Sequence, residues 1–327
     1  MVIDQVNKTA LDNTQTVTIK TTATDTHTYS IDASDIETLT VKMSDASKID
    51  LSSNAMTTAG ATSTLLLTGN KAATLTLVNT DITTIDASGM TQGGSVTQDA
   101  RSTAGAVTYT GSVGNDTLIM GNAADTLAGG AGTDTLDINF DAILGGVNVD
   151  LTSATNQIVS MNGSAPTGTV TGFENVDASG YIGPLGAQIT GTSTGSTITG
   201  TAKDDSVLGG AGVDTITGGA GVDAINAAGG ADVIVLGDST DANNYDQITG
   251  FTTTSDDIKA LQSVHGWNSV DNTTTVLLST GATVKAADVA GDSNIITIST
   301  DIATHTYATF MAGTSTYAEL DGNGYHC

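Results

Sequence analysis

The chain has 327 residues, and 35 acidic residues against only nine Lys and Arg give it a formal net charge of −26. That charge would repel the phosphates of a nucleic acid. The single Cys excludes a disulfide framework, and the lack of an apolar run of about 18 residues excludes a transmembrane helix. Glu37, Glu174 and Glu319 are the only glutamates, so the negative charge is almost entirely Asp, a residue that favours turns over helices.

Residues 1–110 are rich in Thr and carry pairs of apolar residues separated by one position, such as Leu39/Val41 and Leu65/Leu67. This alternation predicts short strands with one buried face. The simplest architecture is a parallel β-solenoid that continues into the repeats described next. A small antiparallel sandwich is the alternative. The first ten residues lack a basic stretch followed by an apolar core, so no Sec-type signal peptide is expected.

A tetrapeptide recurs outside the repeats, as IDAS at 31–34 and 85–88 and as VDAS at 176–179. We interpret its apolar residue as part of a strand and its Asp-x-Ser as a corner in which the carboxylate binds its own backbone. A metal-binding role for Asp86 or Asp177 is the alternative interpretation.

Residues 111–137 and 191–236 fall into a nine-residue register, most clearly in GGAGTDTLD (129–137) and GGAGVDTIT (209–217). The sixth position is Asp in every repeat except the first of the second block, where it is Ser196. The eighth position is always apolar. Glycine-rich turns adopt positive φ angles readily, and the apolar residue of the short strand that follows faces a core. Each nonapeptide therefore predicts one turn and one strand.

Two nonapeptides make one coil of about 18 residues, which stacks Asp116 on Asp134, Asp205 on Asp223 and Asp214 on Asp232. Stacked carboxylates repel one another unless a cation neutralises them. Carboxylate and carbonyl oxygens suit a hard cation, which indicates Ca²⁺ rather than a transition metal. The predicted ligand-bearing turns contain Asp116, Asp125, Asp134, Asp205, Asp214, Asp223, Asp232, Gly130, Gly132, Gly210, Gly212, Gly219 and Gly221.

Two further segments complete the predicted organisation. Residues 138–190 form a β-rich insertion between the blocks, and residues 237–327 form a C-terminal capping and secretion segment. Within the latter, Asp246, Ile248 and Phe251 fit a D-x-I-x-x-F pattern, which we expect to cover the end of the roll.

Signatures of enzymes are weak. No HExxH motif occurs, so a zinc protease is not supported. One G-x-S-x-G string, Gly191–Gly195, opens a nonapeptide register, and a nucleophile elbow would instead need a following helix. The sequence therefore predicts a protein without catalytic activity.

The GGxGxDxUx repeats are those of RTX proteins. Together with the Asp-x-Ser corners and Thr-rich strands, they resemble the RTX-type surface-layer proteins of Gram-negative bacteria. The resemblance implies an all-β fold, a calcium-binding β-roll within a parallel β-solenoid. It also implies a structural protein exported by a type I system, folded by Ca²⁺ outside the cell and assembled with copies of itself at the cell surface. Cell-surface polysaccharide is a further candidate partner.

Two other functions remain open at this point. An RTX adhesin or biofilm-matrix protein would carry similar repeats, and so would the non-catalytic C-terminal module of a secreted RTX enzyme. Ordered sheets formed with Ca²⁺ would distinguish a surface-layer protein from both.

Overall fold

The computed structural model describes residues 14–19, 28–30, 38–43, 47–50, 63–77, 82–91, 96–101, 105–139, 145–236, 246–251, 256–260, 273–278, 295–299 and 307–311. In these ranges the chain forms strands β1 to β27 and no helix. None of the described residues belongs to a helix that could cross a bilayer. The predicted all-β class is confirmed. The chain divides into two compact units, the first comprising 1–140 and 153–175 and the second 141–152 and 176–327.

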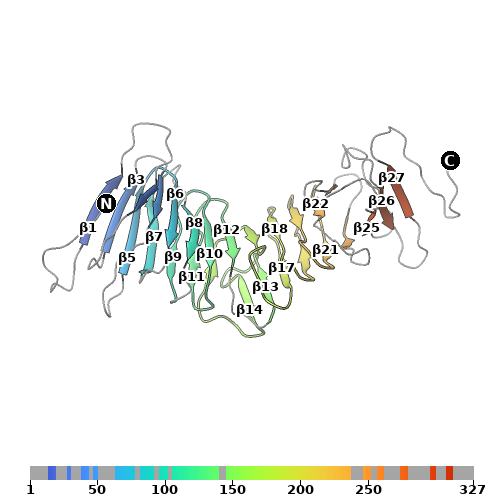
Figure 1. Cartoon of the computed structure of the whole chain (residues 1–327), viewed down its shortest axis with the longest axis horizontal. Helices are drawn as coiled ribbons and strands as arrows, with labels where there is room; N and C mark the ends of the chain where they lie inside the picture. The colour runs from blue at the N-terminus through green and yellow to red at the C-terminus, as the bar shows by residue number, and fades with distance from the viewer. Residues whose placement is uncertain are drawn as a thin grey trace. The chain divides into compact units, whose positions relative to one another are not determined.

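The first unit is a parallel β-solenoid in which successive strands alternate between two sheets (Figure 1). One sheet runs in the order β1 (Thr14–Ile19), β3 (Thr38–Met43), β5 (Ser63–Gly69), β7 (Ile82–Met90), β9 (Thr108–Thr110), β11 (Thr126–Ala128) and β15 (Val170–Thr171). The other runs in the order β2 (Thr28–Ser30), β4 (Ser47–Asp50), β6 (Ala73–Leu77), β8 (Val96–Arg101), β10 (Thr117–Met120) and β12 (Thr135–Ile138).

The core of this unit is a stack of apolar side chains in register. Leu39 pairs with Leu65, Leu65 with Ile85, and Ile85 with Tyr109, and all four are at most 1% exposed. The residue before each of these four is a threonine. Its side chain faces outward, because the side chains of a strand alternate between its faces. All pairings of the described strands from β1 to β9 are parallel, which confirms the solenoid and excludes the antiparallel sandwich.

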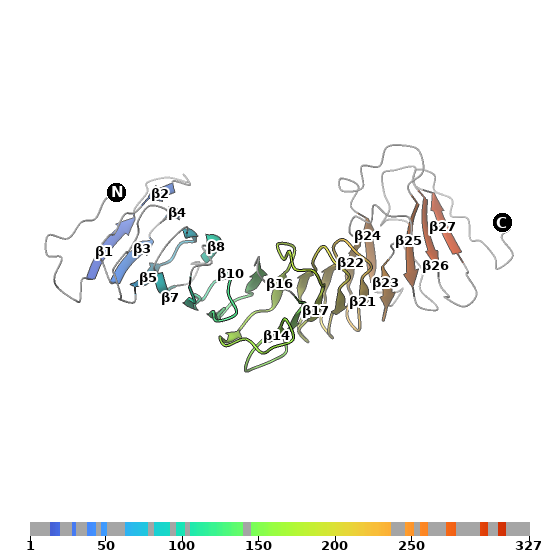
Figure 2. The same cartoon turned by 60° about the horizontal axis from the view of Figure 1, so that its bottom comes forward.

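The second unit also pairs its strands in parallel (Figure 2). One sheet contains β13 (Val147–Asp150), β17 (Ala187–Thr190), β19 (Ser206–Leu208), β21 (Ala224–Asn226), β23 (Gln247–Thr249), β25 (Thr273–Leu278) and β26 (Ile295–Ser299), and ends in the antiparallel β27 (Tyr307–Met311). The other contains β16 (Asn175–Asp177), β18 (Thr197–Thr199), β20 (Thr215–Thr217), β22 (Val233–Leu236) and β24 (Asp257–Ala260).

Each nonapeptide strand buries the residue at the eighth position of its repeat. Ile198, Ile216 and Ile234 form one fully buried stack, and Val207, Ile225 and Ile248 form the other. Full burial of one such side chain contributes about 1.5–3 kcal/mol. Each strand that buries one large side chain therefore adds only a small apolar contribution to the stability of its coil.

Hydrogen bonds within each unit hold the segments of the insertion between the two blocks. In the first unit β14 (Ile158–Met161) leads into a tight hairpin at Asn162 and Gly163, both with positive φ. In the second unit the buried Tyr181 donates its hydroxyl hydrogen to the Gly145 carbonyl.

The hydrogen bond predicted for the Asp-x-Ser motif forms in both described copies, although Asp86 and Ser88 lie within β7, which continues to Met90. The amide of Ser88 donates to Asp86 Oδ1 and that of Ser179 to Asp177 Oδ1, both at 2.9 Å. The copy at 31–34 lies outside the described residues.

The segment that follows the repeats extends the solenoid. Ile248 and Phe251 are buried, 1% and 8% exposed, and β23 pairs in parallel with β25. The single Cys of the chain, Cys327, lies outside the described residues.

Candidate calcium centre

The turn of each GGxG repeat depends on glycine. Gly219 and Gly221 have φ angles of 111° and 127°, which other residues rarely adopt. A Cβ on Gly219 would also lie 1.9 Å from the Thr201 carbonyl oxygen of the preceding coil. Among the other predicted glycines, Gly130, Gly132 and Gly210 share the positive φ, and a Cβ on Gly212 would lie 2.0 Å from the Gly195 amide nitrogen.

The aspartates at the sixth position form ladders that run from coil to coil. In the second unit the Asp205 amide donates to Asp223 Oδ1 at 2.8 Å, and the Asp214 amide donates to Asp232 Oδ1 at 2.9 Å. The Asp116 amide donates to Asp134 Oδ1 at 2.8 Å in the first unit. The predicted stacking of residues 18 positions apart is therefore present in all three pairs. The seven aspartates are at most 3% exposed.

The ladders extend beyond the nonapeptides. The Asp223 amide donates to Asp246 Oδ1 at 3.1 Å, and the Asp232 amide donates to Asp256 Oδ1 at 3.0 Å. In the first unit the Asp134 amide donates to Glu174 Oε2 at 2.8 Å.

The sequence-based ligand set omitted these three acids. The signal was present, because each lies two residues before an apolar strand residue, as in every nonapeptide: Val176, Ile248 and Ile258.

The second carboxylate oxygen divides the aspartates into two groups. Asp116 Oδ2 accepts the Ser112 amide at 2.5 Å and Asp205 Oδ2 accepts the Thr201 amide at 2.6 Å. Asp125 Oδ2 accepts the amides of Gly121 and Asn122. In the four other repeats the Oδ2 atom is buried and has no hydrogen-bond partner in the described chain: Asp134, Asp214, Asp223 and Asp232.

The residue at the second position of the repeat explains this division. In the four repeats with an unpartnered Oδ2 it has a positive φ: Gly130, Gly210, Gly219 and Ala228. Ser112 and Thr201 do not have this conformation, and they donate both a backbone N–H and a side-chain hydroxyl to the aspartate. The four turns with positive φ thus present an anionic oxygen that the protein itself leaves unsatisfied.

Burial raises the pKa of these carboxyls. The pKa of Asp223 rises to about 8, first through burial and then through the charges of Asp246, Asp205 and Asp204. The pKa of Asp134 rises to about 7 and that of Asp214 to about 6, again with burial as the largest cause. A buried carboxylate that lacks a partner needs either a proton or a cation.

Backbone carbonyl oxygens lie beside the unsatisfied carboxylates. A Cβ on Gly209 would be 2.7 Å from Asp214 Oδ2 and 2.8 Å from the carbonyl oxygen of Ala227, one coil later. The missing Cβ therefore lets a carboxylate and a carbonyl oxygen both approach this glycine closely. These donors fit Ca²⁺, which takes six to eight oxygen ligands.

Within the described ranges no group of three or more acidic, His or Cys side chains is placed to hold a metal ion. A cation between two turns would thus take one or two carboxylates and otherwise carbonyl oxygens. The glycine turns would supply the carbonyls.

Several candidates from the sequence lie outside these ladders. Asp86 and Asp177 each bind their own corner backbone. The exposed Ser193 of the G-x-S-x-G string lies in a turn that leads into β18, so the helix of a nucleophile elbow does not follow it. Ser196 occupies the ladder position without a carboxylate, and its amide donates to Asp214 Oδ1 at 2.7 Å.

A family model of the RTX calcium-binding nonapeptide repeat (4 copies) matches residues 108–137, 190–225 and 199–234. No curated protein matches the chain. The matched ranges contain all seven predicted aspartates and all six predicted glycines. Repeats of this family bind Ca²⁺ and are typical of secreted proteins. With its nonapeptide register and its parallel coils, the chain is an RTX-type repeat protein.

Proposed function

We propose that the protein is a calcium-dependent structural component of an extracellular surface layer. In this proposal it leaves the cell by type I secretion, folds when it meets Ca²⁺ outside, and assembles with further copies of itself. It has no catalytic activity. The observation that carries the proposal is the set of four buried aspartate Oδ2 atoms without a hydrogen-bond partner among the described residues, one in each described repeat turn with a positive φ at its second position.

Calcium coupling follows from those four atoms. In a calcium-poor cytosol the buried ladder carboxylates lack a counter-ion and destabilise the RTX blocks, which suits export. At extracellular Ca²⁺ concentrations the ions neutralise the ladder, and their binding free energy becomes folding free energy. The same ions would reduce the net charge of −26 and so the repulsion between neighbouring copies.

Exposed apolar side chains support self-assembly. In the second unit Ile182, Leu185 and Val213 are 66%, 59% and 63% exposed. Contacts between copies would remove such side chains from water. Cell-surface polysaccharide remains the second proposed partner, bridged through Ca²⁺.

The test is to add Ca²⁺ to the calcium-free full chain, following folding by circular dichroism and assembly by electron microscopy. Cooperative folding followed by ordered sheets or filaments is the expected result. A stable folded monomer would contradict the surface-layer role and favour the adhesin. Failure to fold with Ca²⁺ would contradict the whole proposal.

A further inference from the structure

Glu174 ends the carboxylate ladder of the first unit, although it lies outside the nonapeptides and outside the residues matched by the repeat family. Its carboxylate accepts the Asp134 amide at 2.8 Å. In return the amides of Glu174 and Asn175 donate to the Asp134 carbonyl at 3.1 and 2.9 Å. Each of these two segments, 40 residues apart in the chain, therefore donates hydrogen bonds to the other and accepts hydrogen bonds from it.

Gly172 adds a carbonyl oxygen at the same place. A Cβ on Gly129 would lie 2.0 Å from the Gly172 carbonyl oxygen and 2.7 Å from Asp134 Oδ2. A Cβ on Gly209 would likewise lie 2.7 Å from Asp214 Oδ2 and 2.8 Å from the Ala227 carbonyl oxygen. Gly172 thus takes the position that the first residue of the next repeat occupies elsewhere.

Gln157 fixes the backbone between these two oxygen donors. Its side-chain amide donates to the Phe173 carbonyl at 2.7 Å and accepts the Phe173 amide at 3.0 Å. Gln157 and Phe173 are only 3% and 1% exposed. Gly172 and Glu174, on either side of Phe173, are therefore held in place before any ion binds.

Asp134 supplies the atom that needs a ligand. The residue is 1% exposed, and its Oδ2 is buried without a hydrogen-bond partner in the described chain. It lies beside Gly129, whose missing Cβ also lets the Gly172 carbonyl oxygen approach.

We infer that Asp134 Oδ2, the Gly172 carbonyl and the Glu174 carboxylate form a cation site in which residues 172–174 replace the turn of a missing repeat. Its ligands are all oxygens and two are carboxylates, which fits Ca²⁺. The ion would fasten the end of the insertion to the first RTX block. This inference rests on the proposed calcium binding of the repeats.

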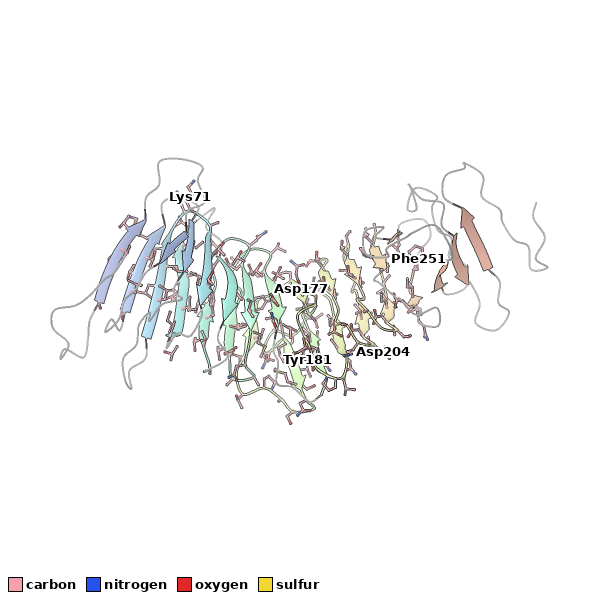
Figure 3. The ribbon with its side chains drawn as sticks, in the orientation of Figure 1. Lys71, Asp177, Tyr181, Asp204 and Phe251 are labelled. Carbon is pink, nitrogen blue, oxygen red and sulfur yellow. The ribbon has the colours of Figure 1, made fainter. Side chains whose placement is uncertain are left out.

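The test compares Glu174→Gln with Asp177→Asn in the full chain. Both changes remove one negative charge, but Asp177, labelled in Figure 3, holds an Asp-x-Ser corner rather than the ladder. Bound Ca²⁺ is counted by equilibrium dialysis. We expect Glu174→Gln to bind one ion fewer than the wild-type chain and Asp177→Asn to bind the full number. Equal numbers in all three chains would overturn the site.

Amide hydrogen exchange of the same proteins gives an independent readout. Ca²⁺ is expected to slow exchange at residues 170–175 and at 209–225 in the wild-type chain, and only at 209–225 in Glu174→Gln. Equal protection of 170–175 in both chains would overturn the site. A wild-type chain that binds no Ca²⁺ would instead overturn the proposed function.

If Glu174→Gln also loses protection at 209–225, Glu174→Asp replaces it, because Asp keeps the charge but shortens the side chain by one methylene. A fall of at least about tenfold in the affinity of one ion is then expected. Unchanged affinity of every ion would overturn the site.

Discussion

The coils before residue 102 and the RTX coils share parallel pairing but differ in what holds them together. Strands β3 and β5 each bury two large apolar side chains, Leu39 with Val41 and Leu65 with Leu67, all fully buried. The RTX strands β18 to β21 each bury one and instead place an aspartate in every turn except that of Ser196. The comparison teaches that coils with the same parallel pairing can bury very different amounts of apolar side chain, and that the proposed ion binding would have to supply the stability that the RTX coils lack.

Removal of Ca²⁺ should destabilise the RTX coils much more than the coils before residue 102. Free Ca²⁺ at about a hundred times its Kd raises the folding equilibrium constant about a hundredfold. With chelator, amide exchange at residues 111–137 and 191–236 should therefore accelerate at least about a hundredfold, while β3, β5 and β7 change little. Hydrogen exchange with mass spectrometry measures both regions in one sample. Equal acceleration in β3, β5 and β7 would show that their coils depend on Ca²⁺ too.

Neutralising one unsatisfied aspartate should weaken Ca²⁺ binding. Asp223 Oδ2 is buried without a partner, so Asp223→Asn should lower the Ca²⁺ affinity of the folded blocks at least about tenfold. Asp205→Asn should have a smaller effect, because the Thr201 amide and hydroxyl already bind that carboxylate. Calcium titrations followed by circular dichroism give both affinities. A larger effect for Asp205→Asn would contradict the division of the aspartates into two groups.

A cavity made by mutation in the coils before residue 102 should lower the unfolding free energy whether or not Ca²⁺ is bound. Leu65 is fully buried between Leu39 and Ile85, so Leu65→Ala should cost about 2–5 kcal/mol of unfolding free energy. Urea denaturation is to be measured with Ca²⁺ and with chelator, because the loss should be similar in both. A loss that appears only with Ca²⁺ would contradict apolar stacking as the source of stability in these coils.

The pH dependence of stability is expected to change when Ca²⁺ is bound. Burial raises the pKa of Asp223 to about 8 and that of Asp134 to about 7, whereas Asp in an unfolded chain titrates near about 4. The calcium-free folded blocks therefore bind more protons than the unfolded chain. Their stability is greatest below about pH 4 and falls as the pH rises through about 7 and 8.

With Ca²⁺ the ions take the place of those protons, so binding weakens in acid. Thermal unfolding with chelator should give a Tm that decreases between about pH 5 and pH 8, and with saturating Ca²⁺ a Tm that does not decrease. A Tm that rises with pH in chelator would contradict the raised pKa values.

The sequence by itself determined the nine-residue register, the buried eighth position and the stacking of aspartates 18 residues apart. These features repeat with a fixed period, and each turn is built from its own residues. Only the tertiary structure decided the parallel arrangement of the described strands from β1 to β9, where Thr38 pairs with Thr64 and Thr64 with Thr84 at unequal spacings.

The structure also decided which carboxylates stay unsatisfied, because that depends on the φ angle at the second position of each turn. It brought Glu174 to Asp134 across 40 residues. No period marks such a contact, because an insertion of irregular length separates the two residues in the chain.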